Sequence, residues 1–422
     1  MAGIISNKEA LATTESRKDA LEIIEAGYKA IDTVAVIHTK IFLKDGALFL
    51  DGVRYELAQY ERIFIIGFGK ASCVASQELE AILGDTLDGG IVIDKKGGVC
   101  KVVHVYQGSH PLPSPYNVEV SQKIAELAKG LTEKDLALVI VSGGGSSLLS
   151  FPMSECEQGN TLYSSFLHAG GTIGELNILR KHISSIKGGG LAQMLHPATV
   201  AGLIFCDVPG DHFQDVASGP TYFDSSTVED ARTIVEKYGL STTFTFNETP
   251  KDHGLFSKVK NIPLVSNKEA LRAMEEESKK RGYRVVCLGD EIYDTPEDFL
   301  KKAHASLSER TVVIAGGELS MAVTHTGGTD GRNLYVAGEA LSVITDDDVF
   351  VSFATDGIDN KSIAAGAIVD SETKKKIQER NIDATDFHTT NRDGEIFISA
   401  DDAIITGETG SNVSDLYLML RK

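Results

Sequence analysis

Residues 311–333 combine a β-branched run with a glycine-rich loop and a single basic side chain. The run at 311–314 breaks at Gly316-Gly317 before Glu318, and Arg332 is the only lysine or arginine in the stretch. Glycines let backbone N–H groups approach a ligand closely, and an arginine offers a planar fork of donors to an oxyanion. The alternative is a glycine-rich hairpin whose second strand runs through Met321 and Val323, with Arg332 on the surface. The stretch alone favours neither interpretation.

Four other loops follow predicted strands and also combine small residues with charged ones. The five loops are residues 67–72, 142–147, 207–211, 316–318 and 355–359. Ligands bind beyond the carboxyl ends of strands in open α/β sheets, so we expect these loops to form a site. Their charged members, apart from Arg332, are Lys70, Asp207, Asp211, Glu318, Asp356 and Asp359. Cations, carboxylates and glycine loops together are the groups that phosphoryl transfer requires.

The loop around Lys70 resembles two nucleotide-binding motifs without matching either. Gly67 and Gly69 start a dinucleotide fingerprint, but its third glycine is replaced by Ser72. A P-loop is excluded because Lys70 is followed by Ala71. A lysine at a helix start opposes the helix dipole and usually needs an anion nearby. We therefore predict that Lys70 and Gly69 contact an anionic ligand; the alternative is a solvated lysine.

A serine–glycine loop follows the next predicted strand, and a pair of aspartates follows the one after it. The first lacks the GxSxG pattern of a nucleophile elbow, so it predicts an anion cradle rather than acyl hydrolysis. Its members are Ser142, Gly143, Gly144, Gly145, Ser146 and Ser147. A tight turn without a ligand is the alternative. Asp207 and Asp211 either form a turn or hold a hard cation through carboxylate oxygens.

Basic residues near 180 lie in a stretch that the sequence predicts as one long helix from Leu162 to Leu195. Arg180 and Lys187 are seven residues apart and would share a face, while Lys181 would project to one side. The group binds an anion or forms a solvated basic surface. His110 and His182 lie near these loops, and we expect each to make structural hydrogen bonds.

Composition excludes several classes of protein. The 422 residues carry 60 acidic and 41 basic side chains, a formal charge of −19, which argues against nucleic-acid and membrane-surface partners. Five scattered cysteines without a CxxC pair predict neither a disulfide framework nor a zinc site. With no apolar signal core and no membrane-length apolar run, we expect a soluble cytoplasmic protein.

Strands alternate with helices of about 10–15 residues, a pattern typical of α/β proteins. We predict two doubly wound, Rossmann-like domains with mostly parallel sheets, at residues 1–241 and 242–422, separated by an interdomain cleft. The junction is placed at 240–262, where periodicity is lost. Beyond it, a strand at 262–267, a helix at 268–281 and a strand at 284–290 are predicted to form a βαβ unit, and helices are predicted near 361–381.

Five motifs follow one another in the order seen in the class II glycerate kinases. They are SGGGSSLL, NILRKHISSIKGGGLA, DVPGDHFQDVASGPT, AGGE with GGTDGRN, and ATDGIDN with AAGAIVD. The chain resembles this family from about residue 14 to 420. The resemblance implies a Rossmann-like N-terminal domain and a C-terminal region called MOFRL.

It also implies ATP- and Mg²⁺-dependent phosphorylation of D-glycerate, most simply on the 2-hydroxyl to give 2-phosphoglycerate and ADP. Lys70 and Arg332 match the family's catalytic cations. Asp207, Asp356 and Glu318 match carboxylates of the interdomain cleft. We hypothesise that Asp207 and Glu318 bind Mg²⁺ and that Asp356 orients or deprotonates the substrate hydroxyl. Arg180, Lys187, Gly317 and Asn333 are assigned to substrate or nucleotide binding.

The family pattern is interrupted at three places, which leaves the details of substrate contact open. Leu334-Tyr335 follow Asn333, Asn360 replaces a glycine, and Glu408 interrupts the last motif. The rival function is an NAD(P)H-dependent hydroxypyruvate reductase, for which Asp88 or Asp94 would follow the first glycine loop at a suitable distance. Glycerate and ATP are the predicted partners, and a homodimer is compatible with the sequence.

Overall fold

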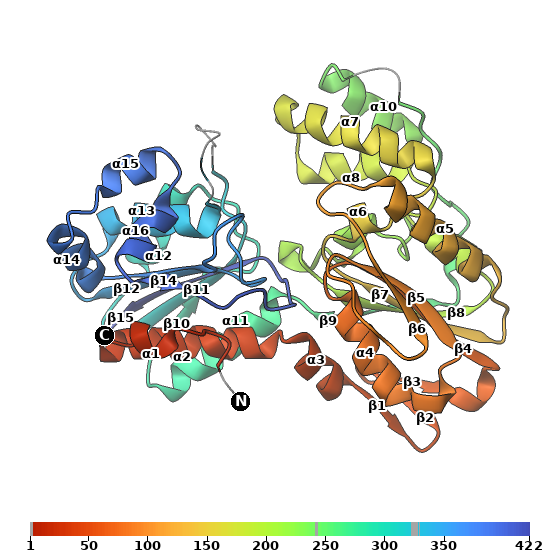
Figure 1. Cartoon of the computed structure of the whole chain (residues 1–422), viewed down its shortest axis with the longest axis horizontal. Helices are drawn as coiled ribbons and strands as arrows, with labels where there is room; N and C mark the ends of the chain where they lie inside the picture. Colours follow the sequence, from red (N-terminus) through yellow and green to blue (C-terminus); the bar gives the residue numbers. More distant parts are fainter. Residues whose placement is uncertain (1–2, 241–243, 322–327, 329) are drawn as a thin grey trace. The chain divides into compact units, whose positions relative to one another are not determined.

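The computed structural model describes residues 3–240, 244–321, 328 and 330–422 (Figure 1). The chain forms two compact units. Unit 1 contains Met1–Ala35, Pro209–Asp211 and Val265–Lys422, and unit 2 contains Val36–Val208 and His212–Leu264. Within the described residues, no helix has the length and hydropathy needed to cross a membrane.

Unit 2 is built on a six-stranded sheet in the order β6-β5-β4-β7-β8-β9. Its strands are β4 (Arg62–Phe68), β5 (Gly89–Asp94), β6 (Val103–Gln107), β7 (Asp135–Val141), β8 (Thr199–Phe205) and β9 (Val259–Val265). Every residue of β7 is buried, as a central strand covered on both faces requires. The chain moves outward from β4 on one side and from β7 on the other, so the switch point of this sheet lies between these two parallel strands.

The helices of unit 2 are α3 (Thr33–Lys40), α4 (Ser72–Leu83), α5 (Pro115–Lys129), α6 (Gly145–Leu148), α7 (Met153–Ala169), α8 (Ile173–His182), α9 (Gly190–Leu195) and α10 (Val228–Lys237). Of these, α7, α8 and α10 pack around a separate apolar core. Alternate residues Ala137, Val139 and Val141 of β7 share one core with α5 and α9. Helix α4 contacts β4, β5 and β7 outside that core, so it packs on the other face. Before this sheet, an antiparallel meander is formed by β1 (Ile41–Lys44), β2 (Ala47–Leu50) and β3 (Val53–Glu56).

The long helix predicted from Leu162 to Leu195 is wrong: this stretch holds the end of α7 and two further helices, α8 and α9. Gly170 adopts a φ of +72° after α7, and Thr172 then caps α8 through a capping box. Gly188 and Gly189 take φ values of +53° and +86° before α9. These glycines in left-handed conformations separate the helices, although the spacing of the apolar residues alone predicts one continuous helix.

Unit 1 contains a mixed six-stranded sheet in the order β10-β11-β15-β12-β13-β14. Its strands are β10 (Arg284–Cys287), β11 (Thr311–Gly317), β12 (Asp348–Ala354), β13 (Gly366–Val369), β14 (Ala403–Ile404) and β15 (Asp415–Arg421). Only β10 and β11 pair in parallel; β15 lies between β11 and β12 and is antiparallel to both. The α/β class is confirmed, while the pairing in this second sheet is mixed rather than mostly parallel.

The helices of unit 1 are α1 (Lys8–Leu11), α2 (Glu15–Ala30), α11 (Asn267–Lys280), α12 (Pro296–Ala305), α13 (Arg332–Val343), α14 (Ser371–Glu379), α15 (Ala384–Thr389) and α16 (Asp393–Ser399). Strand β13 precedes α14 in the region predicted as helices near 361–381. The predicted βαβ unit does not form, because β9 belongs to the sheet of unit 2 and β10 to that of unit 1. Val323 of the predicted second hairpin strand lies outside the described residues.

The N-terminal helix belongs with the C-terminal half of the sequence. Helix α2 packs along α11 (Figure 1) and also contacts β12 and β15. Fully buried Arg17 donates to Asp370 at 2.7 Å and to Asp402 at 2.5 Å. The compact units therefore divide the chain differently from the predicted domains at 1–241 and 242–422, since an amphipathic helix packs wherever its apolar face is matched.

Candidate active site

The loops that follow β4 and β7 are locked together in unit 2. Phe68 pairs in register with Val141, so both loops begin at the same edge of the sheet. The Lys70 backbone N–H donates to the Gly143 carbonyl at 2.9 Å, and the Ala71 N–H donates to Ser142 Oγ at 3.2 Å. The structure therefore brings together the lysine loop and the serine–glycine loop that the sequence singled out.

Glycine is required in these loops because the chain segments approach closely. Gly69 has a φ of +116°, and a Cβ there would lie 2.2 Å from Ser142 Oγ. A Cβ on Gly143 would lie 2.3 Å from a carboxylate oxygen of Asp207, and one on Gly144 would lie 2.9 Å from the His110 ring. Asp207, which follows β8, thus lies directly against the loop that we predicted to bind an anion.

A cavity of about 310 Å³ opens beside this loop, within unit 2. Its polar lining is His110, Gly144, Ser146, Ser147, Glu155, Asn177, Arg180, Lys187, Asp207 and Asp215, and its apolar lining includes Leu112, Ile173, Ile183 and Val208. Burial and then the nearby Lys70 lower the pKa of His110 to about 4. His110 is therefore a neutral hydrogen-bonding group at pH 7, placed where a ligand would meet it.

The serines of the loop have different surroundings. Ser142 Oγ lies within hydrogen-bonding distance of Phe68 and Ala71, and Ser147 Oγ donates to the Gly144 carbonyl at 3.1 Å. Ser146 Oγ lies 3.1 Å from Ser218 Oγ, which in turn donates to Asn177 at 3.2 Å. Gly145 packs against Phe68 and Ala217. Ser142 and Gly145 thus hold the loop in shape, whereas Ser146 and Ser147 reach the cavity.

Arg180 and Lys187 both line the cavity but do not share a helix face as predicted. Helix α8 ends at His182, and Lys187 lies beyond it. Buried Lys187 forms an ion pair with Glu155 and donates to the Leu149 carbonyl at 2.7 Å. Burial lowers the pKa of Lys187, and Glu155 opposes this shift. The Arg180 guanidinium lies 5.6 Å from the centroid of the Tyr163 ring.

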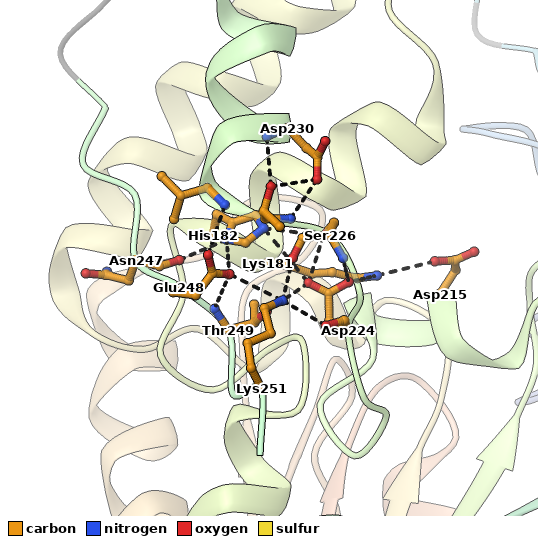
Figure 2. Close-up of polar contacts among 12 residues, drawn as sticks. Lys181, His182, Asp215, Asp224, Ser226, Asp230, Asn247, Glu248, Thr249 and Lys251 are labelled. Carbon is orange, nitrogen blue, oxygen red and sulfur yellow. Dashed lines mark hydrogen bonds and ion pairs between the residues drawn. The ribbon is translucent and has the colours of Figure 1, made fainter. Parts of the chain in front are cut away.

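The two residues after Arg180 are tied to the protein by a polar cluster (Figure 2). Lys181 lies 3.3 Å from Asp224 and 3.8 Å from Asp215. His182 is fully buried, with Nδ1 2.9 Å from the Asn247 carbonyl and Nε2 3.3 Å from Ser226 Oγ. The structural role predicted for His182 is confirmed. Burial would raise the pKa of Asp224, but Lys181 and the hydroxyls around it lower the pKa overall.

In unit 1, Arg332 begins α13 and contacts two carboxylates. Its guanidinium lies 3.0 Å from Glu318, just after β11, and 3.0 Å from Asp415, the first residue of β15. Burial would lower the pKa of Arg332, but Asp415 and Glu318 raise it. The arginine is therefore charged and held in one orientation. Figure 1 shows α13 beside the unit 1 sheet that carries both carboxylates.

Asn333, predicted to bind ligand, is instead fully buried and engaged inside unit 1. Its side-chain N–H₂ donates to Asp415 at 2.8 Å, and its carbonyl oxygen accepts from Ser352 at 2.7 Å. Asp359 accepts backbone N–H groups from Gly331 at 3.1 Å and Leu334 at 2.9 Å, which caps α13. Burial, together with Asp415, raises the pKa of Asp359 to about 7.

Gly317 and Asp356 also follow strands of the unit 1 sheet. Gly317 has a φ of +152°, and a Cβ there would lie 2.2 Å from the Ile292 carbonyl oxygen, which explains the glycine without a ligand. Asp356 follows β12, and one of its carboxylate oxygens accepts the Ile358 N–H at 3.3 Å. Asp415 was missed by sequence reasoning, because it begins a plain apolar strand without any glycine signal.

The carboxylates predicted to hold a cation belong to different units. Asp207 is in unit 2, whereas Glu318 and Asp211, which forms an ion pair with Lys268, are in unit 1. Among the described residues, no group of three or more His, Cys, Asp or Glu side chains could hold a metal ion. Mg²⁺ binds kinases through one or two carboxylates together with substrate phosphates, so the chemistry of Asp207 beside the glycine loop still fits it.

Comparison with known proteins agrees with this organisation. Residues 19–247 match the family described as Domain of unknown function (DUF4147), and residues 311–415 match the MOFRL family. The chain is 31 % identical over 383 residues to the D-glycerate 2-kinase of Thermotoga maritima, covering 85 % of this chain and 91 % of that protein. It is 30 % identical over 432 residues to the glycerate 2-kinase of Picrophilus torridus, covering 99 % of both.

A relative from Agrobacterium vitis with a provisional name as hydroxypyruvate reductase is 31 % identical and covers 85 % of this chain and 99 % of its own. The crystal structure of the Thermotoga maritima glycerate kinase superposes with a TM-score of 0.82 at 28 % identity, covering 96 % of this chain and 99 % of that one. Both family regions and nearly the whole fold are thus shared, and the chain belongs to the glycerate kinase family.

Proposed function

We propose that the protein transfers the γ-phosphoryl group of ATP to the 2-hydroxyl of D-glycerate, giving 2-phosphoglycerate and ADP. The observation that carries the proposal is the interlocked pair of loops at the switch point of unit 2. They place Lys70, the Gly143-Gly144 backbone and Asp207 around one position. A cation, a glycine loop and a carboxylate in contact are what phosphoryl transfer needs from a protein. The glycerate 2-kinase names of relatives support the same reaction.

Residues of both units have roles in this proposal. Lys70 and Arg332 neutralise charge on the transferring phosphoryl group, and Asp356 orients or deprotonates the hydroxyl of glycerate. The loop of residues 142–147 binds phosphate oxygens through the backbone N–H groups of Gly143, Gly144 and Ser146. The Gly69 N–H donates to the Ile93 carbonyl at 3.2 Å, so Gly69 supports this loop rather than supplying a donor. Asp207 and Glu318 would hold Mg²⁺, which supplies further neutralisation of phosphate charge when bound. Glu318 is paired with Arg332, so its role as a ligand requires that this ion pair rearrange.

The experiment incubates the purified protein with D-glycerate, ATP and MgCl₂ and follows the products by ³¹P NMR. A phosphoester resonance that matches authentic 2-phosphoglycerate supports the proposal. A 3-phosphoglycerate product would correct the assigned hydroxyl, and ATP left intact would reject the kinase. A parallel reaction with EDTA tests the metal, because loss of turnover that excess Mg²⁺ restores is the expected result.

Hydroxypyruvate reductase is the second candidate, and the name of the Agrobacterium vitis relative favours it. Against it stands Ser72 at the third glycine position of the first loop. Incubation with hydroxypyruvate and NADH, monitored at the absorbance of NADH, decides the question. We expect no oxidation above the rate without enzyme.

We also propose a cytoplasmic protein that acts on small molecules and forms a homodimer. None of the five cysteines, all of which the structure describes, forms a disulfide, as a reducing compartment favours. Light scattering coupled to size exclusion should give twice the chain mass of 45.3 kDa. A monomer at micromolar concentration would remove the dimer from the proposal.

A further inference from the structure

Arg180 is the basic residue of the cavity whose charge the protein leaves available. Of the other cavity-lining groups, Lys187 is paired with Glu155 and Asp215 lies 3.8 Å from Lys181. Within the part of the chain that the structure describes, Arg180 makes no ion pair or hydrogen bond; its one contact of this kind is with the face of the Tyr163 ring. The side chain is partly buried, which lowers the pKa of its guanidinium, and Tyr163 and Glu155 oppose this shift.

The protein holds Arg180 in place without using its donors. Its neighbours Lys181 and His182 are fixed to Asp224, Ser226 and the Asn247 carbonyl (Figure 2). Thr172 fixes the other end of α8 through its capping box. The centroid of the Tyr163 ring lies 5.6 Å from the guanidinium carbon, and the described residues leave the N–H donors of Arg180 without a hydrogen-bond partner. A partly buried cation without an anion costs free energy, so such a group is kept where a ligand supplies the anion.

The shape and charge of the cavity select the kind of anion. Its volume of about 310 Å³ lies at the low end of the roughly 300–1,000 Å³ range of ligand sites. One arginine matches one carboxylate bidentately, whereas a triphosphate requires several cations. Neutral His110 and Ser146 line the same cavity and can hydrogen bond to hydroxyl groups. Gly144, against which Lys70 lies, lines it as well.

We propose that the cavity of unit 2 binds the acceptor substrate, a short 2-hydroxycarboxylate, and that Arg180 binds its carboxylate. The substrate hydroxyl then faces Gly144 and His110, on the side of Lys70. This inference rests on the proposed function for the identity of the acid, glycerate. Arg180 is thus a specificity-determining residue that separates glycerate from uncharged molecules of the same size.

The test compares D-glycerate with its amide, glyceramide, which has the same size and lacks the charge. Binding is measured by calorimetry without nucleotide, for wild type, Arg180→Met and Arg180→Lys. Wild type should bind glycerate about 100-fold more tightly than glyceramide, and Arg180→Met should bind the two about equally. Arg180→Lys should retain an intermediate preference, because a lysine keeps the charge but loses the fork. Arg232→Met, on the exposed side of α10, is the matched control.

Kinetics give the second readout. Arg180→Met should raise the KM for D-glycerate about 100-fold and change the KM for ATP less than about twofold. A raised KM for ATP with an unchanged KM for glycerate would assign Arg180 to nucleotide and overturn the inference. An Arg180→Met protein that still prefers the carboxylate would overturn it too. Thermal unfolding shows whether Arg180→Met is folded. If it is not folded, the KM values of Arg180→Lys are compared with those of wild type instead.

Failure of this inference and failure of the proposed function give different results. If wild type phosphorylates glycerate but does not bind it more tightly than glyceramide, the carboxylate site at Arg180 is rejected and the proposed kinase function is retained. A wild-type protein inactive with glycerate is tested with lactate and glycolate against their amides. If wild type prefers either acid over its amide and Arg180→Met does not, the cavity has a carboxylate site for short 2-hydroxycarboxylates. If wild type prefers neither acid, the carboxylate site is rejected.

Discussion

Arg332 is held by two carboxylates in different environments. Asp415 is 7 % exposed and also accepts a hydrogen bond from Asn333, so it fixes the guanidinium from the protein side. The side chain of Glu318 is 40 % exposed and comes from the loop after β11. Exposed ion pairs contribute little and rearrange readily, whereas buried ones orient their partners. Asp415 is therefore a positioning residue, and the bond to Glu318 is the one that a ligand can replace.

Replacement of Arg332 should reduce the chemical step. Arg332→Met should lower kcat by about 10³-fold, on the scale of arginine-finger losses, with a smaller effect on the KM for either substrate. Asp415→Asn should lower kcat less, because it removes the orientation and leaves the charge. Steady-state kinetics at saturating ATP measure both. Arg284→Met, an exposed arginine that starts β10, is the control; Arg332→Met with near-wild-type turnover would remove Arg332 from the mechanism.

At the scale of elements, three helices of unit 1 meet at one histidine. His388 of α15 lies 2.6 Å from Asp393 of α16 and 3.0 Å from Glu339 of α13. The hydrogen bond that His388 donates to Asp393 raises the pKa of His388 to about 9, and burial opposes this rise. The imidazolium thus cross-links the helices as a charged group at neutral pH.

The stability of wild type should fall as the pH rises through this window. His388 binds a proton more tightly in the folded state than in the unfolded state. Its contribution to the free energy of unfolding is therefore complete below about pH 6.5, which is the pKa of histidine in the unfolded chain, and is lost by about pH 9. Urea unfolding at pH 6.5, 7.5 and 9 measures the effect. His388→Gln should be less stable than wild type at pH 6.5 and nearly equal at pH 9. A constant difference between the two proteins at all three pH values would contradict the linkage.

The cluster of Figure 2 anchors α8 in the same manner. Asp224→Asn leaves Lys181 with only Asp215 at 3.8 Å, so we expect a loss of about 3 kcal/mol in the free energy of unfolding. Because α8 carries Arg180, the KM for glycerate should rise while the KM for ATP stays constant. Glu229→Gln, on the exposed face of α10, should change stability by less than about 0.5 kcal/mol. Equal effects of the two substitutions would show that the cluster does not anchor the helix.

Local signals in the sequence predicted the elements well where caps and turns are encoded by neighbours. Thr14, Ser114, Thr227 and Thr295 each cap the helix that follows them. The loops of Lys70 and Ser142 were also correctly expected to meet, because parallel strands end at one edge. Neighbouring residues do not determine which sheet a strand joins. The sequence therefore predicted β9 and β10, which follow one another along the chain, as one βαβ unit, although they belong to different sheets. Asp415 was missed for the same reason: β15 pairs with strands far away in the sequence.

For the whole molecule, the two units predict different behaviour of fragments. Residues 36–264 contain the complete unit 2 sheet, so this fragment should fold alone and unfold cooperatively in urea. Residues 265–422 lack α2, and with it Arg17, which leaves buried Asp370 without this cation and leaves Asp402 paired with Lys376. That fragment should be unfolded or aggregated by circular dichroism. Joining residues 1–35 to it through a flexible linker should restore a cooperative transition; a stable 265–422 fragment would contradict the role of α2.

The position of β15 has a consequence for synthesis. Strand β15, Asp415–Arg421, is translated after β11 and β12 and lies between them in the middle of the unit 1 sheet. Helix α2 packs on that sheet but is translated nearly 400 residues earlier. At about 5–20 residues per second, the apolar face of α2 remains without β15 for on the order of 20–80 s. Unit 2 is complete well before then, so the nascent chain exposes one finished unit and one unpaired helix until the central strand of unit 1 is made.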